Sequence, residues 1–170
     1  MAQQRSLSLP SDKRKALIRN QVTGLLWHGR IETTLARAKE IRSVAEKMVT
    51  LAVREYDKTV AASKEYHNEK GQIVKLDVVN DDASKLHARR LMMAYLYDVK
   101  IAKKDDENKA DYRERTKDNK HPVVEKLFRD YGPKYRKRNE EKNCAGGYTR
   151  IYRLGPRRGD ASERVLIEMV

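Results

Sequence analysis

Apolar and polar residues alternate at helical spacing in the first part of the chain. Between Pro10 and His28, apolar residues recur at three- and four-residue steps, which is typical of a helix that buries one side. Ser11 or Asp12 can cap the start of this helix by accepting hydrogen bonds from free backbone N–H groups. Gly29 can end it in the left-handed conformation. The pattern therefore predicts a helix that ends at His28-Gly29.

A second stretch of helical spacing follows a short interval. Residues 30–34 have the composition of a short strand, and Thr34 can cap the helix that begins after it. The apolar positions of this second helix lie on one side, at three- and four-residue steps: Ala38, Ile41, Ala45, Met48 and Ala52.

Two further helices are expected in the second half of the chain. Residues 86–98 predict a helix in which Met92 and Met93 fill the core rather than form a binding feature. Pro122 suits the first position of the next helix, which we expect to end near Tyr131-Gly132-Pro133. The basic run 134–139 then predicts a loop that follows phosphates, with one aromatic ring to stack on a base. A disordered solvent tail is the alternative for this run.

The last twenty-three residues have the two-residue period of a β-hairpin. Residues 148–154 alternate, so that Tyr148, Arg150 and Tyr152 point to one side of a strand. Residues 155–160 predict a turn, and residues 165–170 predict the returning strand. The turn carries Arg157 and Arg158, which suit a phosphate-rich partner; a solvated basic turn is the alternative.

Two segments between these elements are more polar. Residues 56–84 are net acidic and alternate after Gly71, which predicts a strand or small hairpin that faces solvent or a protein neighbour rather than a phosphate-rich partner. Residues 103–120 are dense in charge and nearly balanced, which predicts a solvated helix or a mobile loop.

Charge indicates the class of partner. The chain of 170 residues has 38 Lys and Arg against 25 Asp and Glu, a formal net charge of +13. The excess lies in residues 1–54 and 134–164, so a fold that joins both regions would form one basic face. Such an excess favours nucleic acid over a membrane, because the sequence has neither a spanning apolar run nor a signal peptide. A single cysteine, Cys144, indicates a reducing cytoplasm.

Catalytic and metal sites find little support in the sequence. The four histidines are far apart, and none has zinc-ligand spacing with Cys144. Phosphate-binding glycine loops and nucleophile elbows are not found either. We therefore expect no enzyme activity, no cofactor, no metal, no small-molecule substrate and no self-association.

Three blocks of sequence resemble one bacterial family. Residues 11–20, residues 28–42 and the terminal run Gly-Gly-Tyr-Thr-Arg-Ile-Tyr-Arg-Leu-Gly-Pro-Arg-Arg-Gly-Asp are similar to large-subunit ribosomal protein L-seventeen. The resemblance covers about two thirds of the chain; residues 56–84 and 103–120 are insertions relative to the compact family form. Ser8-Leu9 replace a usual Gly-Arg, and Lys13 replaces a usual histidine, which weakens the inference of an RNA contact at the missing arginine.

The resemblance implies a fold and a function. The expected fold is α+β, a single domain over residues 1–170 with four to five helices packed on a small mixed β-sheet and a C-terminal β-hairpin. The expected function is structural: binding and stapling 23S-type ribosomal RNA on the solvent side of the large subunit, near the mouth of the exit tunnel. Neighbouring large-subunit proteins are the other expected partners. A nucleoid or regulatory DNA-binding protein and an RNA-processing enzyme are the alternatives.

The candidate RNA-binding residues are cations of the two basic end regions together with two tyrosines among them. They are Arg5, Lys13, Arg14, Lys15, Arg19, Arg30, Arg37, Lys39, Arg42, Lys134, Tyr135, Arg136, Arg138, Tyr148, Arg150, Arg153, Arg157 and Arg158.

Overall fold

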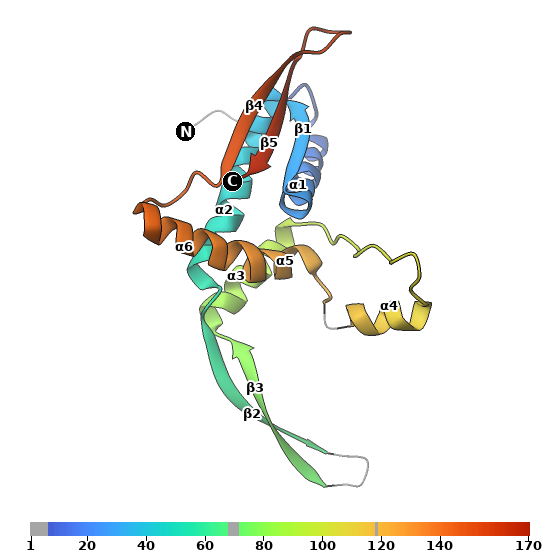
Figure 1. Ribbon diagram of the computed structural model, residues 1–170, viewed down its shortest axis with the longest axis vertical. Helices are drawn as coiled ribbons and strands as arrows, with labels where there is room; N and C mark the ends of the chain where they lie inside the picture. The colour runs from blue at the N-terminus through green and yellow to red at the C-terminus, as the bar shows by residue number, and fades with distance from the viewer. Residues whose placement is uncertain (1–6, 68–71, 118) are drawn as a thin grey trace.

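Figure 1 shows the computed structural model of the chain, which describes residues 7–67, 72–117 and 119–170. The described elements follow in the order α1 (Ser11–His28), β1 (Arg30–Thr34), α2 (Leu35–Glu55), β2 (Thr59–His67), β3 (Ile73–Asp81), α3 (Ala83–Tyr95), α4 (Lys109–Thr116), α5 (Pro122–Lys126), the π-helix η1 (Leu127–Tyr131), α6 (Gly132–Lys142), β4 (Thr149–Pro156) and β5 (Glu163–Met169). The expected α+β fold class and the C-terminal hairpin are confirmed.

The three-stranded sheet joins the two ends of the chain. Its strand order is β1-β5-β4, and β1 pairs with β5 from Arg30 opposite Glu168 to Thr34 opposite Arg164. Both pairings are antiparallel. The sheet is therefore purely antiparallel, whereas a mixed sheet was expected. The pairing shows that the fold brings the two basic end regions together, which was the condition for one basic face.

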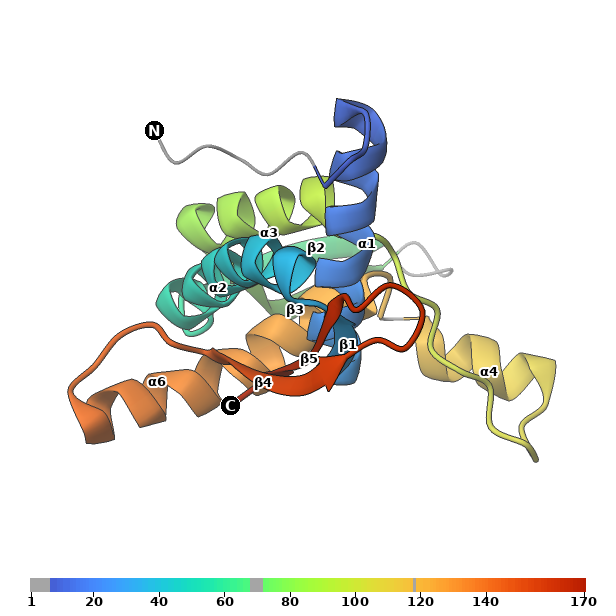
Figure 2. The same ribbon diagram turned by 90° about the horizontal axis from the view of Figure 1, so that it is seen from above.

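Helices α1 and α2 lie on the same side of this sheet (Figure 2). Val165 and Ile167 of β5 are fully buried there, together with Ile41, Ala45 and Val49 of α2. The hydroxyl of Thr149 in β4 donates to a carboxylate oxygen of Glu46 in α2 at 2.8 Å. Apolar burial and this hydrogen bond together fix the sheet to α2.

The starts and ends of α1 and α2 partly follow the sequence prediction. Gly29 ends α1 with φ of 83°, a left-handed conformation that glycine adopts readily, as expected. Pro10, however, stands at the N-cap, and no side chain of the described residues caps this end, so the predicted capping by Ser11 or Asp12 is wrong. Thr34 occupies the N-cap of α2 as expected, again without a side-chain hydrogen bond among the described residues.

The helical segment from Pro122 continues ten residues past the expected end. Helix α5 passes through η1 into α6, which ends at Lys142, so the predicted loop at 134–139 is helical instead. A proline ring in a regular helix clashes with the carbonyl four residues earlier. Here the wider π-turn before Pro133 accommodates the ring, and Pro133 lies in the first turn of α6, where a missing N–H costs little.

The two polar segments extend from the body of the molecule. Strands β2 and β3 form a hairpin at the end opposite the β4–β5 hairpin, and α4 lies apart from the other helices (Figure 1). This confirms the predicted hairpin in 56–84 and the predicted solvated helix in 103–120, since α4 has no buried residue among those described. Helix α3 ends at Tyr95, three residues before the expected end, because Leu96 adopts an extended conformation and is buried.

Candidate nucleic-acid interface

The face of the sheet away from α1 and α2 presents cations and an aromatic ring. Arg30 of β1 and Arg150 of β4 both stand opposite Glu168 of the central strand. Tyr152, opposite Leu166 and two residues from Arg150, projects from the same face and is 40% exposed. This face, which we call the outer sheet face, therefore combines groups that bind phosphate with a ring that can stack on a base.

Three arginines of the sheet and its tip already have carboxylate partners: Arg164 on the outer sheet face, Arg153 on the opposite face of β4, where it stands opposite Val165, and Arg157 at the tip. Arg164 pairs with Glu32 at 3.2 Å, and Arg153 pairs with Glu163 at 3.3 Å. Both pairs are largely exposed, and such pairs contribute about 0–1 kcal/mol, so a phosphate can replace the carboxylate at low cost. The third arginine, Arg157, belongs to the tip of the β4–β5 hairpin.

The hairpin tip separates its two adjacent arginines. Arg157 donates to Asp160 at 2.9 and 2.5 Å, and this hydrogen-bonded pair holds the pKa of the Asp160 carboxyl well below its usual range. The backbone of Arg157 also closes the turn, since its N–H donates to Ser162 and its carbonyl accepts from Ala161. Within the described residues Arg158 has no ion pair or hydrogen bond, so it is the tip residue whose charge is open to a partner. The predicted turn begins two residues too early, because Gly155 and Pro156 still pair with β5.

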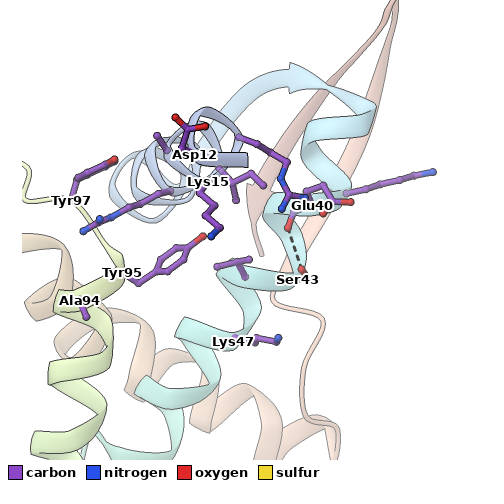
Figure 3. Close-up of a pocket in the computed structure, with 14 residues that line it drawn as sticks. Asp12, Lys15, Glu40, Ser43, Lys47, Ala94, Tyr95 and Tyr97 are labelled. Carbon is purple, nitrogen blue, oxygen red and sulfur yellow. Dashed lines mark hydrogen bonds between the residues drawn. The ribbon is translucent and has the colours of Figure 1, made fainter. Parts of the chain in front are cut away.

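A second cationic region lies on the other side of α1. A groove of about 900 Å³ runs between α1, α2 and the end of α3 (Figure 3). Five cations line it, against two carboxylates and two tyrosines: Arg14, Lys15, Arg19, Lys39, Lys47, Asp12, Glu40, Tyr95 and Tyr97. We call it the α1–α3 groove. The positive excess of the end regions is therefore divided between this groove and the outer sheet face.

Two candidate RNA-binding residues belong to the core instead. Tyr135 is 0% exposed and Tyr148 is 1% exposed, and their ring centroids lie 4.8 Å apart. Burial raises the pKa of the Tyr135 hydroxyl well above its ordinary value. Neither ring has a free face for a base, so the prediction that Tyr135 stacks on a base is wrong, and the buried Tyr148 is not accessible to RNA either. Tyr135 belongs to helix α6, which stands where a loop was expected and packs this ring against Tyr148.

Arg138 and Arg19 have internal partners. Arg138 donates to the carbonyls of Gly146 and Gly147, and its guanidinium lies 4.9 Å from the ring centre of Tyr148, so it ties α6 to the start of β4. Arg19 donates to the carbonyl of Leu96 at 3.2 Å and stacks on Tyr97 at 4.2 Å. Both guanidinium groups are thereby held in fixed positions.

The remaining candidates differ in how their charge is used. Arg42 and Arg136 pair with glutamates one helical turn away, Lys134 donates to the carbonyl of Val170, and Arg14 is also engaged. Within the described ranges, the side chains of six candidates besides Arg158 make neither an ion pair nor a hydrogen bond: Lys13, Lys15, Arg30, Arg37, Lys39 and Arg150. Arg5 lies outside the described residues.

Five residues of these surfaces were missed in the sequence. Tyr152 and Arg164 belong to the outer sheet face, and Lys47, Tyr95 and Tyr97 line the α1–α3 groove. The sequence did contain a signal for Tyr152, because it lies two residues after Arg150 and therefore points to the same side of the strand. Tyr95 had none, because the packing of α3 against α1 and α2 cannot be read from the spacing of a single helix.

Other kinds of site are not evident in the described part of the chain. Over residues 7–67, 72–117 and 119–170, no group of three His, Cys, Asp or Glu side chains could hold a metal ion. Among the helices described, none combines the length and the apolar character needed to cross a membrane.

Comparison with known proteins agrees with the resemblance. The family model for ribosomal protein L17 matches residues 17–170. The chain is 37% identical to large ribosomal subunit protein bL17 of Acetivibrio thermocellus, 40% identical to that of Ruminiclostridium cellulolyticum and 39% identical to that of Clostridium novyi. Each match spans 100% of this chain and 100% of the relative. With a family model over most of its length and full-length relatives at this identity, the chain belongs to the ribosomal protein L17 family.

Proposed function

We propose that this protein is a structural constituent of the large ribosomal subunit that binds large-subunit ribosomal RNA in the bacterial cytoplasm. The observation that carries the proposal is the pairing of β1 with β5, which joins the two basic end regions in one sheet. Family membership supports the large subunit as the site of action.

The mechanism is electrostatic and geometric. Arginines suit it because their planar guanidinium groups can hold phosphate oxygens through two hydrogen bonds. The outer sheet face, with Arg30 and Arg150, and the α1–α3 groove, with Lys15 and Lys39, lie on different sides of α1 and can contact different RNA segments. Neutralised phosphates no longer repel one another, so the protein staples these segments together.

The finer features of the proposal follow the family resemblance. We place the protein on the solvent side of the subunit near the exit-tunnel mouth, with the whole chain as one domain and with 56–84 and 103–120 as insertions. The β2–β3 hairpin points away from the β4–β5 hairpin, and its segment is net acidic (Figure 1). It therefore suits a neighbouring protein better than RNA.

The proposal is tested by retention on the particle. Large subunits are purified from a lysate, washed in high salt and analysed by mass spectrometry. We expect about one copy of this chain per particle, and a variant with Arg30→Glu and Arg150→Glu is expected to be depleted from assembled particles. Loss of the wild-type chain in the wash, or its presence in trace amounts only, would contradict the proposal.

A DNA-binding function is less well supported. A helix-turn-helix motif needs a short turn between two helices, whereas β1 stands between α1 and α2 and is paired in the sheet. Affinity for a large-subunit RNA fragment and for duplex DNA at equal salt distinguishes the two functions. We expect the RNA fragment to bind more tightly.

A further inference from the structure

The α1–α3 groove has a size suited to a small organic group rather than to a nucleic-acid duplex. Its volume of about 900 Å³ falls within the range of about 300–1,000 Å³ that is usual for small-ligand pockets. The outer sheet face, in contrast, is open and can lie along a backbone. The two cationic regions therefore suit different parts of an RNA.

The charge of the groove favours an anion. Lys15 of α1 and Lys39 and Lys47 of α2 all line it, and none of these three has an ion pair within the described residues. Their mutual repulsion is relieved when an anionic group enters between them. Phosphate groups supply that charge.

The groove also presents planar groups beside the cations. Tyr95 is half-buried, and Figure 3 shows its ring and the Lys15 side chain pointing toward each other in the groove. Tyr97 is 39% exposed and carries the guanidinium of Arg19 on its ring at 4.2 Å. Tyrosine rings and arginine planes are the surfaces on which unpaired bases stack.

The backbone holds these planar groups in place. Leu96 is buried, so the chain turns sharply after Tyr95 instead of continuing α3. The N–H of Tyr97 then donates to the hydroxyl of Thr23 in α1 at 3.1 Å, while Arg19 donates to the carbonyl of Leu96. Two hydrogen bonds thus fasten the end of α3 to α1, and the groove is preformed.

We infer that the α1–α3 groove binds an unpaired RNA nucleotide, whose base packs against Tyr95 and the Arg19–Tyr97 pair while its flanking phosphates lie on Lys15, Lys39 and Lys47. The inference rests on the proposed RNA-binding function and adds to it a site for a base outside a helix. An acidic peptide would satisfy the lysines but would leave the planar surfaces without a partner.

The first test locates the nucleotide. The full-length protein is bound to large-subunit ribosomal RNA that contains 4-thiouridine, irradiated and analysed by mass spectrometry. We expect crosslinked peptides that contain Tyr95 and Tyr97 or Lys15, joined to nucleotides that chemical probing of the free RNA shows to be unpaired. Crosslinks confined to the outer sheet face and the hairpin tip would overturn the inference while leaving the proposed function intact.

The second test measures affinity for pentauridylate and for an RNA duplex with the same number of phosphates. We expect Tyr95→Leu and Lys15→Ala each to weaken pentauridylate binding by about fivefold or more, with a smaller effect on the duplex. Tyr95→Phe keeps the stacking surface and should bind as the wild type does. Lys137→Ala, an exposed change on α6 outside the groove, is the matched control.

Three outcomes separate the explanations. If Tyr95→Leu does not fold, Lys15→Ala and the crosslinks still decide the question, because Lys15 is exposed. Competition by polyglutamate as strong as that by pentauridylate would overturn the inference in favour of a general anion site. If the wild-type protein binds neither the ribosomal RNA nor pentauridylate, the proposed function itself fails.

Discussion

The Nε of Arg89 in α3 lies 2.7 Å from Oδ2 of Asp81, the last residue of β3. Arg89 also pairs with Glu125 of α5, and Lys85 reaches the other carboxylate oxygen of Asp81 at 3.0 Å. The side chains of Arg89 and Asp81 are only 20% and 21% exposed, and Arg89 lies over the ring of Phe128. This ion cluster therefore connects the base of the β2–β3 hairpin to two helices of the core.

We expect Asp81→Asn to destabilise the fold by about 1–3 kcal/mol, because it leaves Lys85 and Arg89 without their shared carboxylate in a half-buried place. Urea unfolding at pH 7 measures this loss. Asp77→Asn, on the exposed part of the same strand, is the control and should change the free energy of unfolding by less than about 0.5 kcal/mol.

The destabilisation caused by Asp81→Asn should also depend on pH. Burial raises the pKa of the Asp81 carboxyl, but hydrogen bonds from Arg89 and Lys85 outweigh it, so its pKa lies below the ordinary value. The stability that the ionised Asp81 carboxylate gives the folded state is then fully present above the unfolded pKa of about 3.9, and it is lost as pH falls through the folded pKa. The stability difference between wild type and Asp81→Asn should therefore shrink below about pH 4. A difference that stays constant down to pH 2 would contradict the role given to this carboxylate.

Truncation of the buried Tyr148 ring is expected to lower the stability of the fold. We expect Tyr148→Ala to cost about 3–5 kcal/mol, because the fully buried ring packs against Tyr135. Tyr148→Phe removes only the hydroxyl that accepts a hydrogen bond from Asn139, so its cost should be near 1 kcal/mol. Thermal unfolding of both variants separates the ring from its hydroxyl. An alanine variant as stable as the wild type would mean that Tyr148 is a surface residue, as the sequence suggested.

Gly132 is predicted to tolerate no side chain. A Cβ atom at this position would lie 2.8 Å from Cβ and 3.0 Å from Cγ of Tyr56, so helix η1–α6 and the end of α2 would have to move apart. We expect Gly132→Ala to destabilise by about 1–3 kcal/mol. Gly159→Ala, where nothing lies within 4 Å of the added Cβ, is the matched control. Denaturant unfolding of the pair checks the prediction, and equal midpoints would refute it.

The elements that the sequence predicted well depend on local spacing. The end of α1 at Gly29, the apolar stripe of α2 and the alternation after Thr149 all come from neighbouring positions on one element. Residues whose role depends on a second element were predicted poorly. Tyr148 alternates in step with Arg150, and only the packing of α6 over it shows that it belongs to the core.

The main error in the predicted secondary structure was to end a helix at Gly132-Pro133. Gly132-Pro133 is a usual end of a helix, yet here a π-turn accommodates the ring and the chain remains helical to Lys142. The groove likewise requires three helices to converge, since Lys15, Lys47 and Tyr95 come from distant parts of the sequence. Composition indicates the charge of the partner, but the division of that charge between two surfaces depends on the tertiary structure.

Residues 103–120 are predicted to be dispensable for RNA binding. Helix α4 has no buried residue among those described, and Arg115 donates two hydrogen bonds to Glu107 inside the same segment, which lowers the pKa of Glu107 to about 2. We expect replacement of 103–120 by a flexible glycine-serine linker of equal length to leave the affinity for a large-subunit RNA fragment within about twofold. Filter binding measures it, and a larger loss would place this segment on the RNA.

The hairpin tip gives the most direct test of binding to phosphates. We expect Arg157→Ala combined with Arg158→Ala to weaken RNA binding and to reduce the slope of log affinity against log salt by about 0.7–0.9 for each phosphate that the protein no longer neutralises. Arg158→Ala alone should account for much of this change, because Asp160 already neutralises Arg157. Asp160→Asn is the complementary variant: it frees the Arg157 guanidinium, so RNA affinity should rise at low salt. If the slope of the double variant equals that of the wild type, the tip does not touch RNA, and the cations of the outer sheet face and the α1–α3 groove carry the binding alone.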